Sequence, residues 1–504
     1  MLLPVAACNR LYTAAGVREL DRREIEDHGI DGYALMRTAG TAAFRLLRLR
    51  WPGARKLAVF CGGGNNGGDG LVIARLAQEA GLQAAVGLAT PAERLSGSAA
   101  RALADYRDAG GGLLAPDEVD GAAADVIVDA LLGTGLASAV REPYAGLIER
   151  INAAGRPVLA VDIPSGLSAD TGAVLGTAVR ASATMTFIGR KRGLYTGAAP
   201  ACTGPVFADD LQTPPQIHQD MEAVSESLDA AAVCALLPRR APTVHKGAAG
   251  HLVVVAGNTG MAGAARLAGE AALRTGAGLV TVATRSGHAA ALAGGRPELM
   301  ARGVDDPEAE LAPLLAAADA FVVGPGLGRD EWARMALEQV LAKGPSAGVL
   351  DADALNTIAA DGGAALGPGC VVTPHPGEAG RMLGTSAAAV EADRFDAVWR
   401  LAERYGATVV LKGAGTLIGE AQRAPALIDE ANAAMATGGT GDVLAGTIGA
   451  LLAQGMAPSA AARAGAWLHA RAGRLAVAEG GGLIASDLMG PLGRLRWDVH
   501  VGHA

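Results

Sequence analysis

The stretch Cys61–Gly70, CGGGNNGGDG, decides which fold class the first part of the chain belongs to. It follows the short apolar run KLAVF (56–60) and leads into LVIARLAQEAG (71–81), whose apolar residues have helical spacing. Gly62, Gly64 and Gly67 have the Gly-x-Gly-x-x-Gly spacing of a dinucleotide-binding turn between a strand and a helix. The stretch predicts an α/β fold and leaves open what the turn binds.

An ordinary redox dinucleotide site does not fit this stretch. Such a site needs an acidic residue about 20 positions after the glycines, at the end of the next strand, to hold the ribose. Here that strand, QAAVGLAT (83–90), ends in Thr90. A P-loop is excluded too, because no Gly-Lys-Ser/Thr follows the glycines. The glycine spacing by itself fits a ligand-free turn equally well.

Strand-like apolar runs alternate with helical stretches in two blocks of the chain, which predicts parallel sheets covered on both faces. The runs of the first block are KLAVFCG, QAAVGLAT, DVIVDALLG, RPVLAVDIPSG and ATMTFIG. Those of the second are HLVVVAG, GLVTVAT, AFVVGPG, AGVLDAD, CVVTP and ATVVLKG. Between the blocks, LQTPPQIHQDMEAVSES (211–227) breaks the pattern. We therefore expect a first domain at 1–215, a linker at 216–228 and a second domain at 229–504.

The composition limits the partners and the compartment. The net charge of -8 argues against nucleic acid or an anionic membrane as the main partner. The five cysteines are far apart and form no CxxC pair, which is typical of a reducing compartment. The longest apolar helical stretch, VLAGTIGALLA (443–453), is shorter than the roughly 20 residues that span a bilayer. We expect a cytoplasmic protein, and we also expect it to be a homo-oligomer.

Polar residues gather at three predicted strand ends of the first block. Asn65, Asn66 and Asp69 follow the first strand, Asp129 lies at the end of another, and Asp162 and Ser165 follow the next. Each Asp alone would more often cap a helix or a turn. Together at one sheet edge they predict a shared site. Asn66, Asp129 and Ser165 offer hard oxygens for a monovalent cation, and Asp162 would serve as an acid/base or bind a ribose.

The motifs GGGNNGGDG, VDALLGTGL and VDIPSGL, in this order, resemble the NAD(P)H-hydrate epimerase family. TAAGVRELDRREIEDHGIDGYALMRTAG (13–40) and TFIGRKRGL (186–194) extend the resemblance over nearly all of residues 10 to 210. It implies a Rossmann-like three-layer α/β/α domain that interconverts the epimers of NADHX and NADPHX, with Asp162 catalytic. It also implies potassium held by Asn66, Asp129 and Ser165. The implied substrate contacts are Asn65, Asn66, Gly67, Gly68, Asp69, Gly133, Thr134, Gly135, Leu136, Ala137, Ser138, Ala139 and Asp162.

The second block carries an anion-binding pattern. In ATGGTGD (436–442), glycines allow a tight turn directly before a helix, whose free N–H groups and dipole favour a phosphate. Asp442 beside that turn is either a simple N-terminal charge partner or a base for a hydroxyl. Lys412 and Thr416 flank a second glycine-rich turn, and His375 and Glu378 follow another strand. Asp351, Asp353 and Asn356 follow a third strand.

Gly-Thr-Gly-Asp before a late helix resembles ribokinase-like folds in general. With VVGPGLG, DADALN, TPHPGE, KGAGT and NAAMATGGTGD, residues 240 to 490 resemble the ADP-dependent (6S)-NAD(P)H-hydrate dehydratase family. The implied hydrate contacts are Ala264, Gly326, His375 and the catalytic Asp442. The implied contacts to the adenine nucleotide, bound with Mg²⁺, are Lys412, Gly413, Ala414, Gly415, Thr416 and Gly441.

Both families in one chain imply one repair pathway. The first domain would epimerise R- and S-NAD(P)HX, and the second would dehydrate the S epimer to NAD(P)H while ADP gives AMP and phosphate. The alternative is a ribokinase-like small-molecule kinase fused to a dinucleotide-binding redox domain, for which the ribose acid is missing. A non-catalytic nucleotide sensor would bind the same ligands without turnover.

Overall fold

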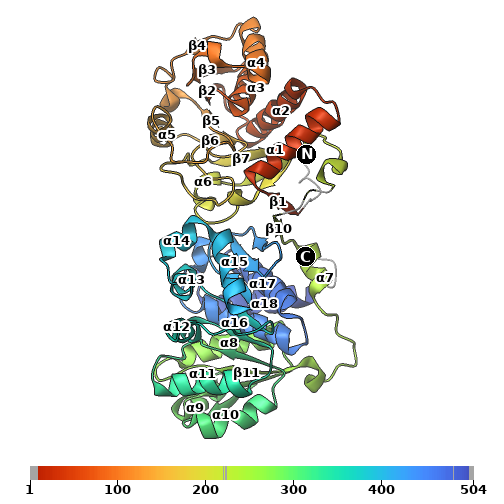
Figure 1. The fold of residues 1–504 in the computed structure, drawn as a ribbon, viewed down its shortest axis with the longest axis vertical. Helices are drawn as coiled ribbons and strands as arrows, with labels where there is room; N and C mark the ends of the chain where they lie inside the picture. Colours follow the sequence, from red (N-terminus) through yellow and green to blue (C-terminus); the bar gives the residue numbers. More distant parts are fainter. Residues whose placement is uncertain (1–8, 220, 222–223, 479, 481, 499–504) are drawn as a thin grey trace. The chain divides into compact units, whose positions relative to one another are not determined.

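The computed structural model describes residues 9–219, 221, 224–478, 480 and 482–498. The chain divides into two compact units, Met1–Ser225 and Glu226–Ala504, which Figure 1 draws in red to yellow and in green to blue. Each unit has α/β layers and an apolar core of its own, as the sequence predicts. Among the residues described, a search for a helix long and apolar enough to cross a membrane finds none.

Both ends of the predicted linker, residues 216–228, contain residues that are buried in the apolar clusters of the two units. Ile217 is 1% exposed and lies in a small apolar cluster of the first unit with Tyr12. At the other end, Leu228 is buried in the core of the second unit, and its backbone N–H donates to the carbonyl of Leu427. Residues 220, 222 and 223 of this segment lie outside the described residues. The domain limits stay a prediction. The stretch between Ile217 and Leu228 is shorter than the predicted linker of residues 216–228.

The sheet in the described part of the first unit has seven parallel strands in the order β4-β3-β2-β5-β6-β7-β9. These strands are β2 (Lys56–Cys61), β3 (Gln83–Leu88), β4 (Leu113–Leu114), β5 (Val126–Ala130), β6 (Val158–Val161), β7 (Ala183–Phe187) and β9 (Val206–Asp209). A short parallel pair adds β1 (Arg10–Tyr12) and β8 (Arg190–Lys191). The helices are α1 (Ala14–Arg22), α2 (Gly32–Arg50), α3 (Asn65–Glu79), α4 (Gly97–Asp108), α5 (Tyr144–Ala153) and α6 (Pro200–Thr203).

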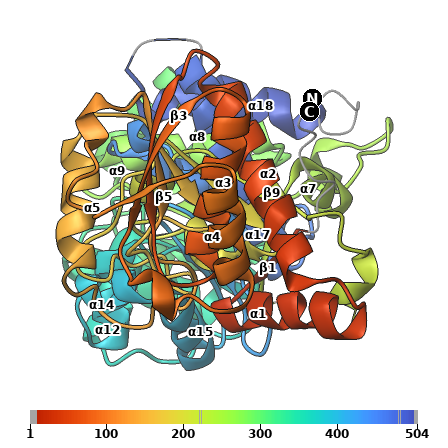
Figure 2. The same ribbon diagram turned by 90° about the horizontal axis from the view of Figure 1, so that it is seen from above.

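The central strand β2 shows why both faces of this sheet are covered. Successive side chains of a strand point to opposite faces. Leu57 and Val59 pack in the core cluster that contains α2, α3 and α4, whereas Ala58 and Phe60 pack with α5. Figure 2 shows α2, α3 and α4 on one side of β3 and β5, and α5 on the other. A continuous apolar run is therefore what this strand requires.

The strand order reverses between β2 and β5. From β2 the chain moves outward to β3 and β4, and it then returns to add β5 on the other side of β2. Parallel sheets bind ligands at such a switch point, beyond the carboxyl ends of the two strands. The glycine-rich stretch after β2 and the loop after β5 both lie there.

Helix α3 begins earlier than the sequence pattern indicates. Residues 65–69 were expected on a turn, but the structure starts the helix at Asn65, with Gly64 as its N-cap. A Cβ on Gly67 would lie 2.0 Å from the carbonyl oxygen of Gly62, so the helix start packs directly on the end of the strand. This close packing overrides the low helix propensity of the glycines, and it corrects the expected turn.

The sheet of the second unit runs β13-β12-β11-β14-β15-β16-β17-β18-β19-β10 and is parallel except for β18, which is antiparallel to both neighbours. Its strands are β10 (Ser225–Ser227), β11 (His251–Val255), β12 (Leu279–Thr284), β13 (Met300–Gly303), β14 (Ala320–Val323), β15 (Gly348–Leu350), β16 (Cys370–Val372), β17 (Thr408–Leu411), β18 (Thr416–Gly419) and β19 (Ala426–Ile428). Its helices are α7 (Ala230–Leu236), α8 (Ala262–Thr275), α9 (Ser286–Gly295), α10 (Pro307–Ala316), α11 (Glu331–Lys343), α12 (Ala352–Ala360), α13 (Pro376–Leu383), α14 (Ala387–Ala392), α15 (Arg394–Tyr405), α16 (Thr440–Ala453), α17 (Pro458–Ala478) and α18 (Met489–Asp498).

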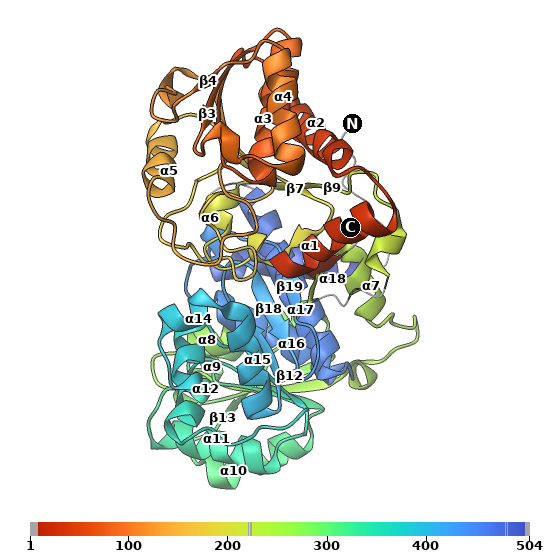
Figure 3. The same ribbon diagram turned by 45° about the horizontal axis from the view of Figure 1, so that its top comes forward.

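This second sheet is also covered on both faces. Val322 of β14 lies against Gly449 of α16, and its neighbour Phe321 lies against Gly344 at the end of α11. Adjacent strand residues face opposite ways, so α16 and α11 cover opposite faces. Figure 3 shows α17 beside β18 and β19 at one end of this sheet. The order reverses between β11 and β14, which places a second switch point after these two strands.

Candidate active sites

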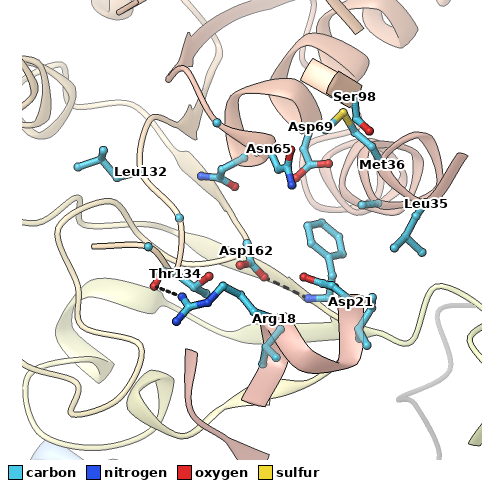
Figure 4. Close-up of a pocket in the computed structure, with 18 of the residues that line it drawn as sticks. Arg18, Asp21, Leu35, Met36, Asn65, Asp69, Ser98, Leu132, Thr134 and Asp162 are labelled. Atoms are coloured by element: carbon cyan, nitrogen blue, oxygen red, sulfur yellow. Dashed lines mark hydrogen bonds between the residues drawn. The ribbon is translucent and has the colours of Figure 1, made fainter. Parts of the chain in front are cut away.

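A cavity of about 650 Å³ lies at the switch point of the first unit. Its wall is built from the start of α3, the loops after β5 and β6, and one face of α1. In Figure 4, Asn65 and Asp69 of α3 face Asp162 and Asp21 across this space. The volume lies within the usual range for small-molecule and cofactor sites.

An ion pair lies at the floor of this cavity. Lys191 of β8 is fully buried and pairs with the carboxylate of Asp162. Its ammonium group also donates to the Thr186 hydroxyl (2.9 Å) and to the carbonyl of Phe187 (3.2 Å). Asp162 has a φ of 67°, a left-handed conformation that costs energy for a residue with a side chain. Such strain is typical of functional sites, and it is consistent with a carboxylate held for chemistry.

Two further carboxyl groups face the same cavity. Burial, followed by repulsion from Asp162, raises the pKa of Asp69 well above its ordinary value. Burial also raises the pKa of Asp21 to about 6, against the opposing effect of the Lys191 charge. One lysine thus faces three acids, and the pKa values of two of them, Asp69 and Asp21, are raised.

The residues predicted to bind potassium lie at the edge of this cavity and beneath it. Asp129 is fully buried; it accepts hydrogen bonds from the Ser165 hydroxyl (2.6 Å) and the Ser165 N–H (2.8 Å). Burial raises the pKa of Asp129 to about 6, and these hydrogen bonds offset only part of the effect. Asn66 is 9% exposed, and both polar atoms of its amide lack a hydrogen-bond partner. An unpaired buried amide of this kind suits a ligand or a cation.

Most of the residues predicted for the first site come together, and some do not. The cavity wall includes Asn65, Asn66, Asp69, Asp162 and the four residues Gly133–Leu136. Gly67 and Gly68 are buried in the packing of α3. Ala137, Ser138 and Ala139 are exposed and do not contribute to the wall.

Sequence reasoning missed Asp21 and Lys191 as members of this site. Asp21 follows Val17 by four positions, so an acid falls on the buried stripe of an amphipathic helix, which was a usable signal. Lys191 lies within the TFIGRKRGL motif, but no spacing rule pairs it with Asp162. Only the parallel pairing of β8 with β1 shows that this strand lies beside the N-terminal segment.

The second site is built around Lys412. Its ammonium lies 2.8 Å from a carboxylate oxygen of Asp351 and 3.8 Å from one of Glu378. A Cβ on Gly441 would lie 3.3 Å from the same ammonium, so Lys412 reaches the first turn of α16. Gly439, the N-cap of this helix, has a φ of 93°, which favours glycine. The sequence analysis places Asp351 and Glu378 at strand ends of this block but assigns neither of them a role.

Asp442 lies in the first turn of α16, beside these charges. Burial, followed by repulsion from Asp351, raises the pKa of Asp442 to about 7, although the Lys412 charge acts in the opposite direction. Beneath this turn, the ring N–H of His469 donates to the carbonyl of Thr440 (2.8 Å). Burial lowers the pKa of His469 to about 4, so its ring is neutral and fixes the turn without adding charge. Asp442 is thus poised to exchange a proton near neutral pH.

Ala264 and Gly326 lie side by side at the second switch point. A Cβ on Gly326 would lie 3.1 Å from that of Ala264 in α8. One turn further along α8, Leu267 lies 2.5 Å from a Cβ built on Gly439. Helix α8 therefore connects this pair to the start of α16 within a single turn.

His375 and the turn Lys412–Thr416 frame the same region. His375 is the N-cap of α13, where its Nδ1 accepts the N–H of Gly377 (3.0 Å). Burial, with the Lys412 charge, lowers its pKa, which keeps that nitrogen available as an acceptor. Under the glycine turn, the buried Arg394 donates to the carbonyls of Leu411 and Lys412, both at 3.1 Å. Arg394 fixes the turn and was missed from the sequence.

The folds and sites define a class: an enzyme with a Rossmann-like unit joined to a ribokinase-like unit. Residues 32–193 match the model for the YjeF-related protein N-terminus, and residues 252–490 match that for NAD(P)H-hydrate dehydratase. The chain belongs to the family of bifunctional NAD(P)H-hydrate repair enzymes, as its resemblance predicts. This membership decides against the kinase fused to a redox domain.

Two relatives carry this assignment, and one solved structure is similar over about half of the chain. The bifunctional NAD(P)H-hydrate repair enzyme Nnr of Coxiella burnetii is 47% identical over 480 residues, which cover 95% of this chain and 97% of that protein. The enzyme of the same name from Escherichia coli is 43% identical, over 98% of this chain and 95% of that protein. A ribokinase-like superfamily protein from Enterococcus faecalis, 27% identical, aligns with a TM-score of 0.52 over 55% of this chain and 97% of that protein.

Proposed function

We propose that the first unit interconverts R- and S-NAD(P)HX and that the second dehydrates the S epimer to NAD(P)H, converting ADP to AMP and phosphate. The proposal rests on one carboxyl group at each of the two switch points. Asp162 forms an ion pair with Lys191, and Asp442 lies in the first turn of α16, next to the anion-binding turn. The direct test supplies both epimers with and without ADP and follows the absorbance of the restored dihydronicotinamide. Recovery of the R epimer without ADP would contradict the division of labour.

In the second unit, Asp442 and Lys412 would promote phosphorylation of the ring hydroxyl, because phosphate is a better leaving group than hydroxide. Asp442 takes the proton of the C6 hydroxyl, whose oxygen attacks the β-phosphorus of ADP, and AMP leaves. The lone pair of the ring nitrogen then expels phosphate, and loss of the C5 proton restores the ring double bond. Lys412 offsets charge at the phosphates, while Gly413–Gly415 and the start of α16 surround them.

The described residues offer a set of oxygen ligands for potassium but no such set of side chains for Mg²⁺. Asn66 fits potassium, because its buried amide is unpaired and the oxygens of Asp129 and Ser165 are hard ligands. For Mg²⁺, the described residues contain no cluster of three or more His, Cys, Asp or Glu side chains placed to bind a metal. Mg²⁺ bound with ADP would therefore take most ligands from phosphates and water. We place the enzyme in the cytoplasm; homo-oligomerisation stays a prediction.

Asn66→Ala should abolish most of the response of epimerisation to potassium. Loss of a direct oxygen ligand should raise the KCl concentration for half-maximal activity at least about tenfold. The melting temperature should change little, because the amide has no partner to lose. The measurement is epimerisation against KCl at constant ionic strength. Asn65→Ala is the matched control: it should raise KM and leave the potassium response intact, and an unchanged response in Asn66→Ala would contradict the assignment.

A fragment of residues 224–504 should fold and dehydrate the S epimer while leaving the R epimer to its spontaneous exchange. A second fragment, 229–504, lacks β10 and the buried Leu228, and should be less stable by about 2–5 kcal/mol. Denaturant unfolding and an epimer-resolved assay check both. Epimerisation by either fragment, or an insoluble 224–504 fragment, would place the boundary or the division of labour elsewhere.

A further inference from the structure

The charge balance of the epimerase cavity leaves one acid without an assigned role. Asp21, Asp69 and Asp162 face the cavity, and Lys191 is the cation paired at its floor. The other cationic group in the wall is Arg18, whose guanidinium contacts the carbonyl of Thr134 at 3.5 Å. Lys191 is paired with Asp162. Among the described residues, Asp21 has no ion pair, and it lies beside the Asp162 carboxylate.

Asp21 is placed to reach a bound ring. It is partly exposed, it lines the cavity, and its side chain points toward the same space as that of Asp162 (Figure 4). Glu19, on the same helix, is also partly exposed, but it does not line the cavity. It pairs instead with Arg22 (2.8 Å) and Arg23 (3.0 Å). Helix α1 thus carries one acid that is paired with arginines and one that lines the site.

We infer that Asp21 is a second catalytic residue of the epimerase, and that it shares one proton with Asp162 in a reciprocal acid/base pair that opens and recloses the hydrated ring. The inference rests on the proposed epimerase function. In the substrate, C6 carries both the hydroxyl and the ring nitrogen, so it is a carbinolamine. Such a centre inverts if the carbon–nitrogen bond opens and closes on the other face.

The proton inventory balances through this cycle. Asp162 takes the hydroxyl proton, the C6–N1 bond breaks, and its electron pair goes to N1, which takes the proton of Asp21. C6 is now an aldehyde, and rotation about C5–C6 exposes its other face. N1 then attacks C6 and returns its proton to Asp21, while the oxygen takes back the proton of Asp162. No oxidant and no added water is consumed.

The electrostatics support this pairing. The pKa of Asp21 is raised to about 6, mainly by burial. The Lys191 charge acts to lower this pKa, and the negative charge of Asp162 acts to raise it. When Asp162 takes a proton, that repulsion disappears and Asp21 releases its own proton more readily. Asp69 and Arg18 are the other charged groups that face the pair across the cavity.

The test compares Asp21→Asn, Asp21→Glu and the control Glu19→Gln in the full-length enzyme, with the enzyme-free epimerisation rate subtracted. Asp21→Asn should lower kcat for epimerisation by about 10²–10⁴-fold while KM stays within about threefold. In the wild type, kcat/KM for epimerisation should decrease as the pH rises above about 6, because Asp21 loses its proton. This alkaline limb of the pH profile should vanish in Asp21→Asn. Asp21→Glu should restore part of the rate together with the limb, and Glu19→Gln should match the wild type.

Each result decides one point. An Asp21→Asn variant with a near-normal rate, or a slow one that keeps the wild-type limb, would overturn the inference. Failure of the wild-type enzyme to interconvert the epimers would instead reject the proposed function itself.

Discussion

Asp442→Asn should lower ADP-driven dehydration of the S epimer by about 10²–10⁴-fold, the usual contribution of a general base. The amide keeps the shape of the side chain but cannot accept the hydroxyl proton. Stability should hold, because the favourable interaction of an acid with a helix N-terminus is offset here by repulsion from Asp351. The measurements are single-turnover formation of NADH, and ADP binding by calorimetry.

The pH profile gives the same prediction a second readout. A base with a pKa of about 7 is active when deprotonated, so dehydration should rise with pH toward 7 and level off above it. The residual rate of Asp442→Asn should lack this rise, and its epimerisation should be normal. A variant with near-normal dehydration would reject Asp442 as the base. One that no longer binds ADP would make it a binding residue.

Asp162→Asn should reduce epimerisation by about 10²–10⁴-fold with dehydration unchanged. Its amide oxygen still accepts a hydrogen bond from Lys191, but the lysine charge is left buried without its partner. Breaking a buried ion pair from one side costs about 3–5 kcal/mol. Urea unfolding of the first unit should detect that loss.

The double variant Asp162→Asn/Lys191→Met separates chemistry from stability. With both charges removed, much of the lost unfolding free energy should return, because no buried charge is left unpaired. Activity should stay low, since no group at position 162 accepts a proton. Recovery of activity in the double variant would show that Asp162 acts only as the counter-ion of Lys191.

Local patterns were sufficient for much of the fold. Continuous apolar runs predicted strands β2, β3, β5, β6 and β7 in the first unit, because strands covered on both faces cannot alternate with polar residues. The edge strands β4 and β9 were missed, because none of their residues is fully buried and no long apolar run marks them. The start of α3 was misplaced, since glycine propensity alone argues against a helix there.

The sequence by itself determined the two α/β units, their glycine turns, and the polar residues at strand ends such as Asp162 and Asp442. These features are local: apolar periodicity, turn chemistry and strand-end position can be read within a short window. Tertiary structure alone decided which charges meet. Lys191 and Asp21 reach Asp162 from separate elements, and Asp351 reaches Lys412 across strands. The shifted pKa values of Asp21 and Asp442 follow from burial and from those neighbours, which no sequence window contains.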